Sequence, residues 1–235
     1  MANKKKQQGV IDVNDTINKS EAFFIQYKKP LFIAIIALIV IIAGLFLYKE
    51  YFSGPREEKA STALARGQEY FNSEQFDKAL NGDGAGYTGF LKIASDFGST
   101  DAGNLANLYA GLCYANLDKW EDAVKFLDKY EPANDAMISP AALAALGNAY
   151  AHVNQLDKAV STLLKAADKA DKQGVDGVNN SLAPTFRLQA AQILESQDKK
   201  DEALKIYEGI KTKYVNSALV QSQEIEKYIQ RLSSK

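Results

Sequence analysis

Two kinds of hydrophobic pattern follow one another along the chain. From Leu31 to Tyr48 the residues read LFIAIIALIVIIAGLFLY, without a single charge. A helix of this length spans roughly 27 Å at about 1.5 Å per residue, enough to cross the hydrocarbon core of a bilayer. Tyr and Phe flank the run on both sides, where amphipathic rings prefer the membrane interface. The pattern predicts a tail over residues 1–30 and a transmembrane helix over residues 31–52.

This helix is expected to remain in the mature protein as an anchor. A cleaved signal peptide has a short basic start, a shorter apolar core and a small-residue cleavage site, whereas this core is long and ends in Phe, Tyr and Lys. Apolar residues among the charges of residues 10–29 are compatible with an amphipathic helix running into the membrane. Ser53-Gly54-Pro55 is a break suited to ending the membrane helix.

Beyond this break the chain repeats itself. Each of four units has a small residue, then Tyr or Leu three positions later, then Ala nine positions after that. Small residues allow two helix backbones to cross closely, while the larger side chain fills the space beside the crossing. The four sets recur at intervals of 44, 36 and 44 residues: Gly67-Tyr70-Ala79, Gly111-Tyr114-Ala123, Gly147-Tyr150-Ala159 and Ala191-Leu194-Ala203.

This spacing of residue types resembles that of the tetratricopeptide repeat, a helix-turn-helix unit of about 34 residues. The resemblance implies an all-α protein in which the transmembrane helix is followed by a helical-repeat solenoid over residues 56–235. We expect about four helix pairs plus a C-terminal capping helix within Ser217–Leu232, whose apolar residues form one stripe. The extra length of the first and third units is expected in loops at Asn81–Gly86 and Lys172–Asn180.

Composition and charge exclude several classes of function. The formal net charge of -1 offers no basic field for nucleic acid, so no nucleic-acid partner is expected. His152 is the only histidine and Cys113 the only cysteine, so no zinc site of ordinary ligand count and no Ser-His-Asp set stands out. The Gly-rich run at residues 82–86 follows no predicted strand and lacks the Lys-Ser/Thr ending of a phosphate loop. We expect no enzyme activity, cofactor, metal or small-molecule substrate.

The distribution of charge favours one orientation. Before Leu31 the chain has six Lys against three acidic residues, net +3, which leaves -4 for the rest because the total is -1. Such asymmetry favours a cytoplasmic tail, and large domains are translocated regardless of charge. The repeat domain is therefore expected on the opposite side of the membrane. The positive charges immediately flanking the helix are similar on both sides and do not decide the orientation alone.

The tetratricopeptide pattern also implies which residues of the first helices face a concave groove. These positions are apolar with amides and hold no Lys or Arg, which a clamp for a carboxylate would require. We expect the groove to contact the backbone and apolar side chains of an extended partner. The leucines of the early units could equally be core residues between repeats. The predicted groove residues are Leu64, Gln68, Phe71, Asn72, Leu108, Leu112, Asn116, Asn148, His152, Leu188 and Gln192.

Tail, anchor and external repeat domain together resemble the YfgM-like family of ancillary subunits of the bacterial Sec translocon. The resemblance includes the approach to the membrane from Glu21-Ala22-Phe23-Phe24 to Lys28-Lys29. It implies a single-pass protein of the bacterial inner membrane with a cytoplasmic N-terminus and a periplasmic repeat domain. Its implied role is a chaperone-like scaffold that contacts translocon subunits, nascent exported chains or envelope chaperones. The alternative is an adaptor of another envelope machine, in secretion, motility or cell-wall assembly, that binds folded partners.

Overall fold

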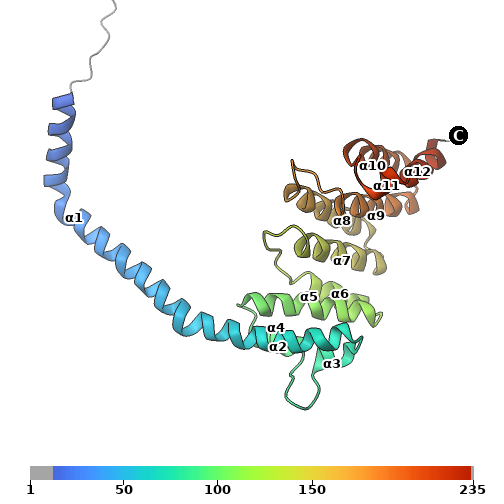
Figure 1. Cartoon of the computed structure of the whole chain (residues 1–235), viewed down its shortest axis with the longest axis horizontal. Helices are drawn as coiled ribbons and strands as arrows, with labels where there is room; N and C mark the ends of the chain where they lie inside the picture. The colour runs from blue at the N-terminus through green and yellow to red at the C-terminus, as the bar shows by residue number, and fades with distance from the viewer. Residues whose placement is uncertain (1–12, 234–235) are drawn as a thin grey trace, which may run out of the picture. The chain divides into compact units, whose positions relative to one another are not determined.

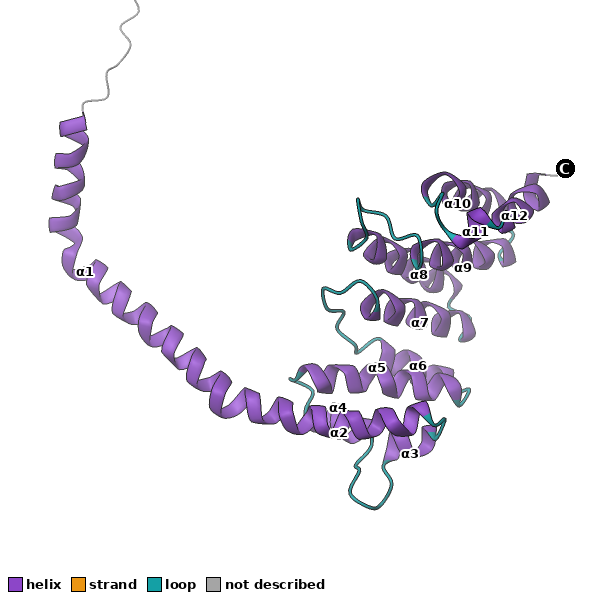
Figure 2. Cartoon of the chain, in the orientation of Figure 1, coloured by secondary structure: helices purple, strands orange, loops and turns teal. Residues whose placement is uncertain are grey.

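The computed structural model describes residues 13–233, and every regular element within that range is a helix (Figures 1 and 2). The backbone forms two compact units, divided between Pro55 and Arg56. The predicted all-helical fold class is therefore confirmed. The first twelve residues of the predicted tail, and residues 234 and 235 of the predicted repeat domain, lie outside the described residues.

The first unit is built from α1 (Val13–Tyr48) and a five-residue π-helix, η1 (Lys49–Ser53). Pro30 lies inside α1, where it has no N–H for the helical hydrogen bond, and α1 bends (Figure 1). From residue 27 onward every side chain of this unit is exposed, Phe46 to 68%. An apolar helix with nothing packed on it is unfavourable in water and favourable in lipid. It is long and apolar enough to span a membrane.

The break predicted at Ser53-Gly54-Pro55 is not a loop. The N–H of Gly54 donates to the carbonyl of Lys49, five residues back, and the next helix, α2, begins at Gly54 itself. A boundary between helices thus lies where the sequence predicted a break, although no loop separates the two. Proline is favourable in a first helical turn, where its missing N–H would have had no partner.

The second unit consists of four helix pairs that follow one another in chain order, closed by short helices (Figure 1). Each pair contains a first helix and a second helix joined by a tight turn. The first helices are α2 (Gly54–Asn72), α5 (Asp101–Asn116), α7 (Ile138–His152) and α9 (Ala183–Ser196). The second helices are α3 (Phe76–Asn81) with α4 (Phe90–Asp96), α6 (Trp120–Leu127), α8 (Leu156–Lys172) and α10 (Lys200–Lys213). The closing helices are α11 (Ala218–Gln221) and α12 (Glu224–Ser233).

The small residues of the repeat lie where the paired helices cross. A Cβ placed on Gly111 would lie 2.5 Å from Cγ of Leu127. In the next pair a Cβ on Gly147 would lie 2.8 Å from Cγ of Leu163. These two leucines occupy the same position relative to the repeat alanines, so the crossings are equivalent. The four repeat alanines, Ala79, Ala123, Ala159 and Ala203, are all fully buried.

The first pair differs because a loop over residues 82–89 divides its second helix into α3 and α4. Gly82 and Gly89 bracket the loop with φ of +98° and +90°. A Cβ on Gly89 would lie 2.2 Å from the carbonyl oxygen of Leu80, so only glycine allows the two ends of the loop to approach. The sequence predicted that the extra length of the first unit lies in a loop at Asn81–Gly86. The insertion interrupts one helix.

Phe90 restores the crossing after this loop. A Cβ on Gly67 would lie 2.4 Å from Cε1 of Phe90, which is fully buried. Phe90 thus packs against Gly67 in the first pair as Leu127 packs against Gly111 in the second. The sequence alone offered no bulky residue four positions beyond Ala79.

Asp83 ties the inserted loop to α2. Its Oδ2 accepts hydrogen bonds from Tyr70 (2.8 Å) and Arg66 (2.9 Å). Its Oδ1 accepts from the backbone N–H groups of Ala85 (2.8 Å) and Tyr87 (2.9 Å). The bond from Tyr70, followed by the two backbone bonds, lowers the pKa of Asp83 to about 2. The loop is therefore held by an ionised carboxylate.

This carboxylate predicts a specific acid sensitivity. Because the folded pKa of Asp83 lies below its ordinary value, its stabilising contribution is complete above about pH 5 and is lost as the pH falls toward 2. The melting temperature of wild type minus that of Asp83→Asn, followed by circular dichroism, should be constant from pH 7 to 5 and shrink below pH 4. Tyr70→Phe should shift this loss to higher pH. A difference that persists unchanged to pH 2 would contradict the assignment.

The C-terminal helices cover the open end of the last pair. Ile225 is fully buried, and Tyr228, Ile229 and Leu232 pack against the same hydrophobic cluster. The predicted apolar stripe therefore seals the stack. The prediction of one helix is corrected in detail, because Gln223 has a φ of +59° and separates α11 from α12.

Candidate protein-binding groove

The eleven predicted groove residues fall on α2, α5, α7 and α9, and the structure distributes them among different environments. Leu64, Leu108 and Leu188 are core side chains, exposed to only 6%, 6% and 8%. Phe71 and Leu112 are half-buried and pack against the clusters that contain Leu64 and Leu108. These apolar side chains therefore stabilise the stacking of the pairs, the alternative that the sequence left open for the early leucines.

The predicted amides of α2, α5 and α9 lie nearer the surface, and three of them bond within the chain. Gln68 Nε2 donates to the hydroxyl of a tyrosine on α5 at 2.9 Å. Asn116 Nδ2 donates to a carbonyl one turn earlier in α5 at 2.8 Å. Gln192 Nε2 donates to the hydroxyl of Tyr228 at 3.3 Å. The fourth amide, Asn72 at the end of α2, is exposed.

Asn148, His152 and Gln192 come together around one open hollow of about 590 Å³. Its lining combines an aromatic pair, two aliphatic side chains, three amides and a hydroxyl, and contains no Lys, Arg, Asp or Glu. Residues from α6, α7 and α9 contribute to it. We name the eight lining residues the groove residues: Trp120, Asn148, Ala151, His152, Gln189, Gln192, Ile193 and Ser196.

Trp120 and His152 form the aromatic wall of this hollow. Their ring centroids are 3.6 Å apart and their planes are within 5° of parallel. Trp120 is half-buried at the start of α6, whereas His152 is exposed at the end of α7. The stack presents a flat apolar surface with polar ring edges. Nothing local in the sequence places Trp120 beside His152.

The repeat pattern also missed part of the wall contributed by α9. Gln189, Ile193 and Ser196 line the hollow, one position beyond the column expected to contain Leu188 and Gln192. Leu188 is instead turned into the core. The helix is rotated about its axis relative to the expected column, so only one of the four groove residues on α9 was predicted from the sequence.

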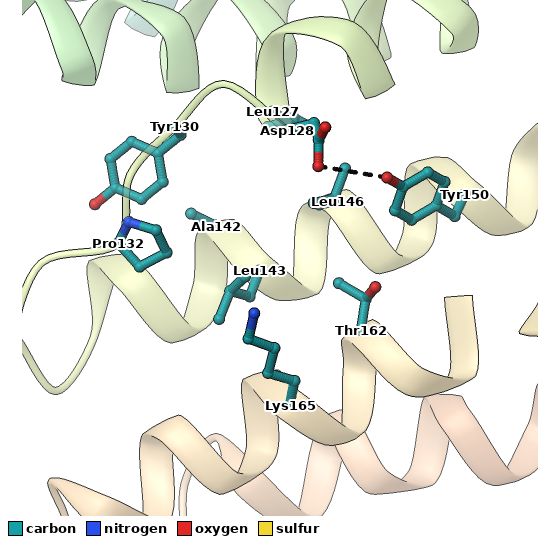
Figure 3. A pocket seen from close by; sticks show the side chains of 10 residues that line it. All are labelled: Leu127, Asp128, Tyr130, Pro132, Ala142, Leu143, Leu146, Tyr150, Thr162 and Lys165. Atoms are coloured by element: carbon teal, nitrogen blue, oxygen red, sulfur yellow. Dashed lines mark hydrogen bonds between the residues drawn. The ribbon is translucent and has the colours of Figure 1, made fainter. Parts of the chain in front are cut away.

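A second hollow of about 230 Å³ lies between the end of α6, α7 and α8 (Figure 3). Its walls are mainly apolar, with the ammonium of Lys165 directed toward Leu143. The hydroxyl of Tyr150 donates to Asp128 at 3.4 Å along one side. None of the predicted groove residues lines this hollow, and its volume suits a single side chain. The larger hollow is therefore the better candidate for binding a chain segment.

Comparisons with known proteins agree with this architecture. A family model described as a tetratricopeptide repeat matches residues 142–174, which cover most of α7 and α8. The second unit has the tetratricopeptide-repeat fold. A crystal structure of nearly identical TPR-like repeats attributed to a kinesin light chain of Podosopora anserina superposes with a TM-score of 0.51, at 11% identity over 76% of this chain and 96% of that one. A variant of the same repeats has a TM-score of 0.52, at 12% identity over 75% of this chain and 93% of that one.

No match was found among curated protein sequences. Tetratricopeptide repeats are typically protein-interaction scaffolds without catalytic activity, so the fold supports a protein-binding role. Cys113 is fully buried, and burial raises the pKa of its thiol to about 12. It is therefore a protonated packing residue of the tetratricopeptide core at neutral pH.

Proposed function

We propose that this chain is a membrane-anchored scaffold whose tetratricopeptide domain binds extended segments of other proteins. The observation that supports it best is the open hollow on α6, α7 and α9, where a flat aromatic stack lies beside uncharged amides. The exposed apolar helix of the first unit provides the anchor. Binding at this hollow requires no cofactor and no chemical step.

The chemistry of the groove residues fits a peptide backbone. Asn148 and Gln192 offer amide groups for pairing with peptide groups, while Ile193 and the aromatic stack offer apolar contact. No Lys or Arg is present to hold a terminal carboxylate. We infer that the ligand is an internal, uncharged stretch of an extended or partly folded chain.

For the cellular setting, we propose the bacterial inner membrane with the repeat domain in the periplasm near the Sec translocon. The net positive tail supports this orientation, and the resemblance to the YfgM-like family supports the partner. Tethering would concentrate the domain at the site where exported chains emerge, so weak contacts at the groove residues suffice.

The binding proposal can be tested through Trp120, the only tryptophan of the chain. Titrating the full-length protein in liposomes with a tryptophan-free, permanently unfolded polypeptide should change its fluorescence in a saturable manner. The double variant Asn148→Ala, Gln192→Ala should raise the Kd about tenfold, because each lost hydrogen bond contributes about 0.5–1.5 kcal/mol net. Lys125→Ala, exposed on α6 outside the hollow, is the matched control. Equal affinities for the two variants would contradict the proposal.

The cellular setting needs a separate experiment. A photo-crosslinking residue at Gln192 should capture translocon subunits together with many unfolded exported chains. Capture of a single folded envelope protein would favour the adaptor of another machine. Protease added to intact and to opened cells tests the orientation, because digestion of the repeat domain only after the inner membrane is opened would place it in the cytoplasm and reject this setting.

A further inference from the structure

The exposed large apolar side chains of the second unit are confined to three connections. Among the described residues after Pro55 they are Met137 (71% exposed), Ile138 (52%), Val175 (84%) and Val215 (51%). All four lie where a second helix leads into the following helix. The turns within the pairs carry no comparable side chain in the described part of the chain.

These connections form one edge of the domain, beginning at the start of α2. The Glu57 carboxylate accepts hydrogen bonds from the N–H groups of Asp101 (2.8 Å) and Ala102 (3.0 Å) at the start of α5. In the first turn of α5, Asn104 exchanges two hydrogen bonds of 2.8 Å with the backbone of Glu131 in the α6–α7 connection. The first two pairs are thus joined along this edge to the connection that carries Met137.

The contacts continue to the end of the stack. Gln173 in the α8–α9 connection donates to Asn134 in the α6–α7 connection at 2.5 Å. Asp171 pairs with Lys213, at the end of α10, at 2.6 Å. Figure 2 shows the α6–α7 and α8–α9 connections on the same side of the stack. We name this surface, from Glu57 through residues 131–138 and 173–182 to residues 215 and 216, the entry edge.

The chain enters the domain at this same edge. Arg56 follows Phe52, the end of the predicted membrane segment, by four residues, which span at most about 14 Å when extended. Arg56 donates to the carbonyl of Asp96 at 2.7 Å, so the first residues of the domain are fixed beside α4. The entry edge therefore starts within a few residues of the predicted membrane segment.

The entry edge is also suited to a partly dehydrated setting. Two of its carboxylates have partners within the domain, since Asp135 bonds to Ser139 and Asp171 bonds to Lys213 and Tyr214. The side chains of Glu131 and Asp176 on the same edge are exposed and would lie at the level of the lipid headgroups. Valine, isoleucine and methionine side chains that remain 51–84% exposed are unfavourable in water. The same side chains are favourable at the boundary between lipid headgroups and acyl chains.

We propose that the entry edge rests on the lipid bilayer and inserts Met137, Ile138, Val175 and Val215 at the headgroup level. The inference rests on the proposed function, because the anchor must first bring the domain to the membrane. Contact at this edge would orient the first helices away from the lipid. The groove residues lie toward the opposite ends of α7 and α9, about 20 Å away along a helix of this length. The hollow would then stay open to partners.

Lipid contact is measured with fluorophores on the full-length protein in vesicles that contain a nitroxide-labelled lipid. Ala136→Cys and Asn216→Cys place the label on the entry edge, and Lys119→Cys and Gln155→Cys place it in turns within pairs. Native Cys113 is fully buried and does not compete. We expect several-fold stronger quenching at the entry edge than at the turns. Equal quenching at all four positions would overturn the inference.

Replacing the exposed apolar side chains with charged ones tests whether they hold the edge on the lipid. Met137→Asp, Val175→Asp and Val215→Asp together should reduce quenching at the entry edge to the level of the turns. Matched charges at Gln75, Lys119 and Gln155 should leave it unchanged. Release of the unmodified protein from membranes by alkaline carbonate would reject the anchor and this inference together. Retention with no quenching at the entry edge would reject this inference alone, as would capture of a folded protein at this edge in cells.

Discussion

Replacing Gly111 with leucine should lower the free energy of unfolding by about 3 kcal/mol, near the upper end of the usual effect of overpacking. Even a Cβ at this position would lie 2.5 Å from Cγ of Leu127 and 2.9 Å from its backbone nitrogen. A side chain could change rotamer, but the backbone of α6 cannot move without separating the pair. The loss should appear as a lower midpoint in urea denaturation followed by circular dichroism.

Gly209 provides the matched control for this prediction. It also lies within a helix, α10, but a Cβ there would meet no atom within 4 Å. Gly209→Ala should therefore stabilise the domain by about 0.5–1 kcal/mol through helix propensity alone. Gly111→Ala should destabilise it despite the same gain in propensity. Equal effects of the two alanine variants would show that the close crossing at Gly111 is not needed.

Asp171→Ala is expected to cost about 3 kcal/mol, because it removes one member of a buried network. Asp171 is only 5% exposed and accepts hydrogen bonds from Lys213 (2.6 Å), Tyr214 (2.6 Å) and the N–H of Asn179 (3.0 Å). Burial acts to raise its pKa, but these bonds prevail and hold the pKa below its ordinary value. Arg187 donates to Tyr214 at 2.7 Å and completes the network.

Asp168→Ala is the control for this prediction, because it also removes a carboxylate that pairs with Arg187. Asp168 pairs with Arg187 at 2.5 Å but is 68% exposed. Asp168→Ala should therefore change the free energy of unfolding by less than about 1 kcal/mol. Thermal and urea denaturation of both variants provide the comparison. If the two substitutions cost the same, the α8–α9 connection is held by something other than Asp171.

The sequence predicted part of the groove and misplaced part of it. Asn148 and His152 were predicted correctly as neighbours because they lie one turn apart on a single helix, where local spacing determines proximity. On α9, three of the residues that line the hollow lie one position beyond those that the repeat pattern predicted. Glu195, three residues after Gln192 on α9, accepts hydrogen bonds from Tyr207 on α10 (2.7 Å) and Arg231 on α12 (2.6 Å). These contacts between helices, invisible in a local pattern, accompany the rotation of α9.

By itself, the sequence determined the class of the fold, the number of helix pairs and the existence of an exposed apolar helix. Small residues, aromatics and alanines at fixed spacing specify close crossings between neighbours in the chain, and such local contacts repeat in the same way each time. The tertiary structure decided that Phe90 replaces the missing large residue of the first pair and that Trp120 stacks on His152. It also decided that the exposed apolar side chains share one edge. These features depend on the paths of loops and the rotation of helices, which are set by contacts between residues far apart in the chain.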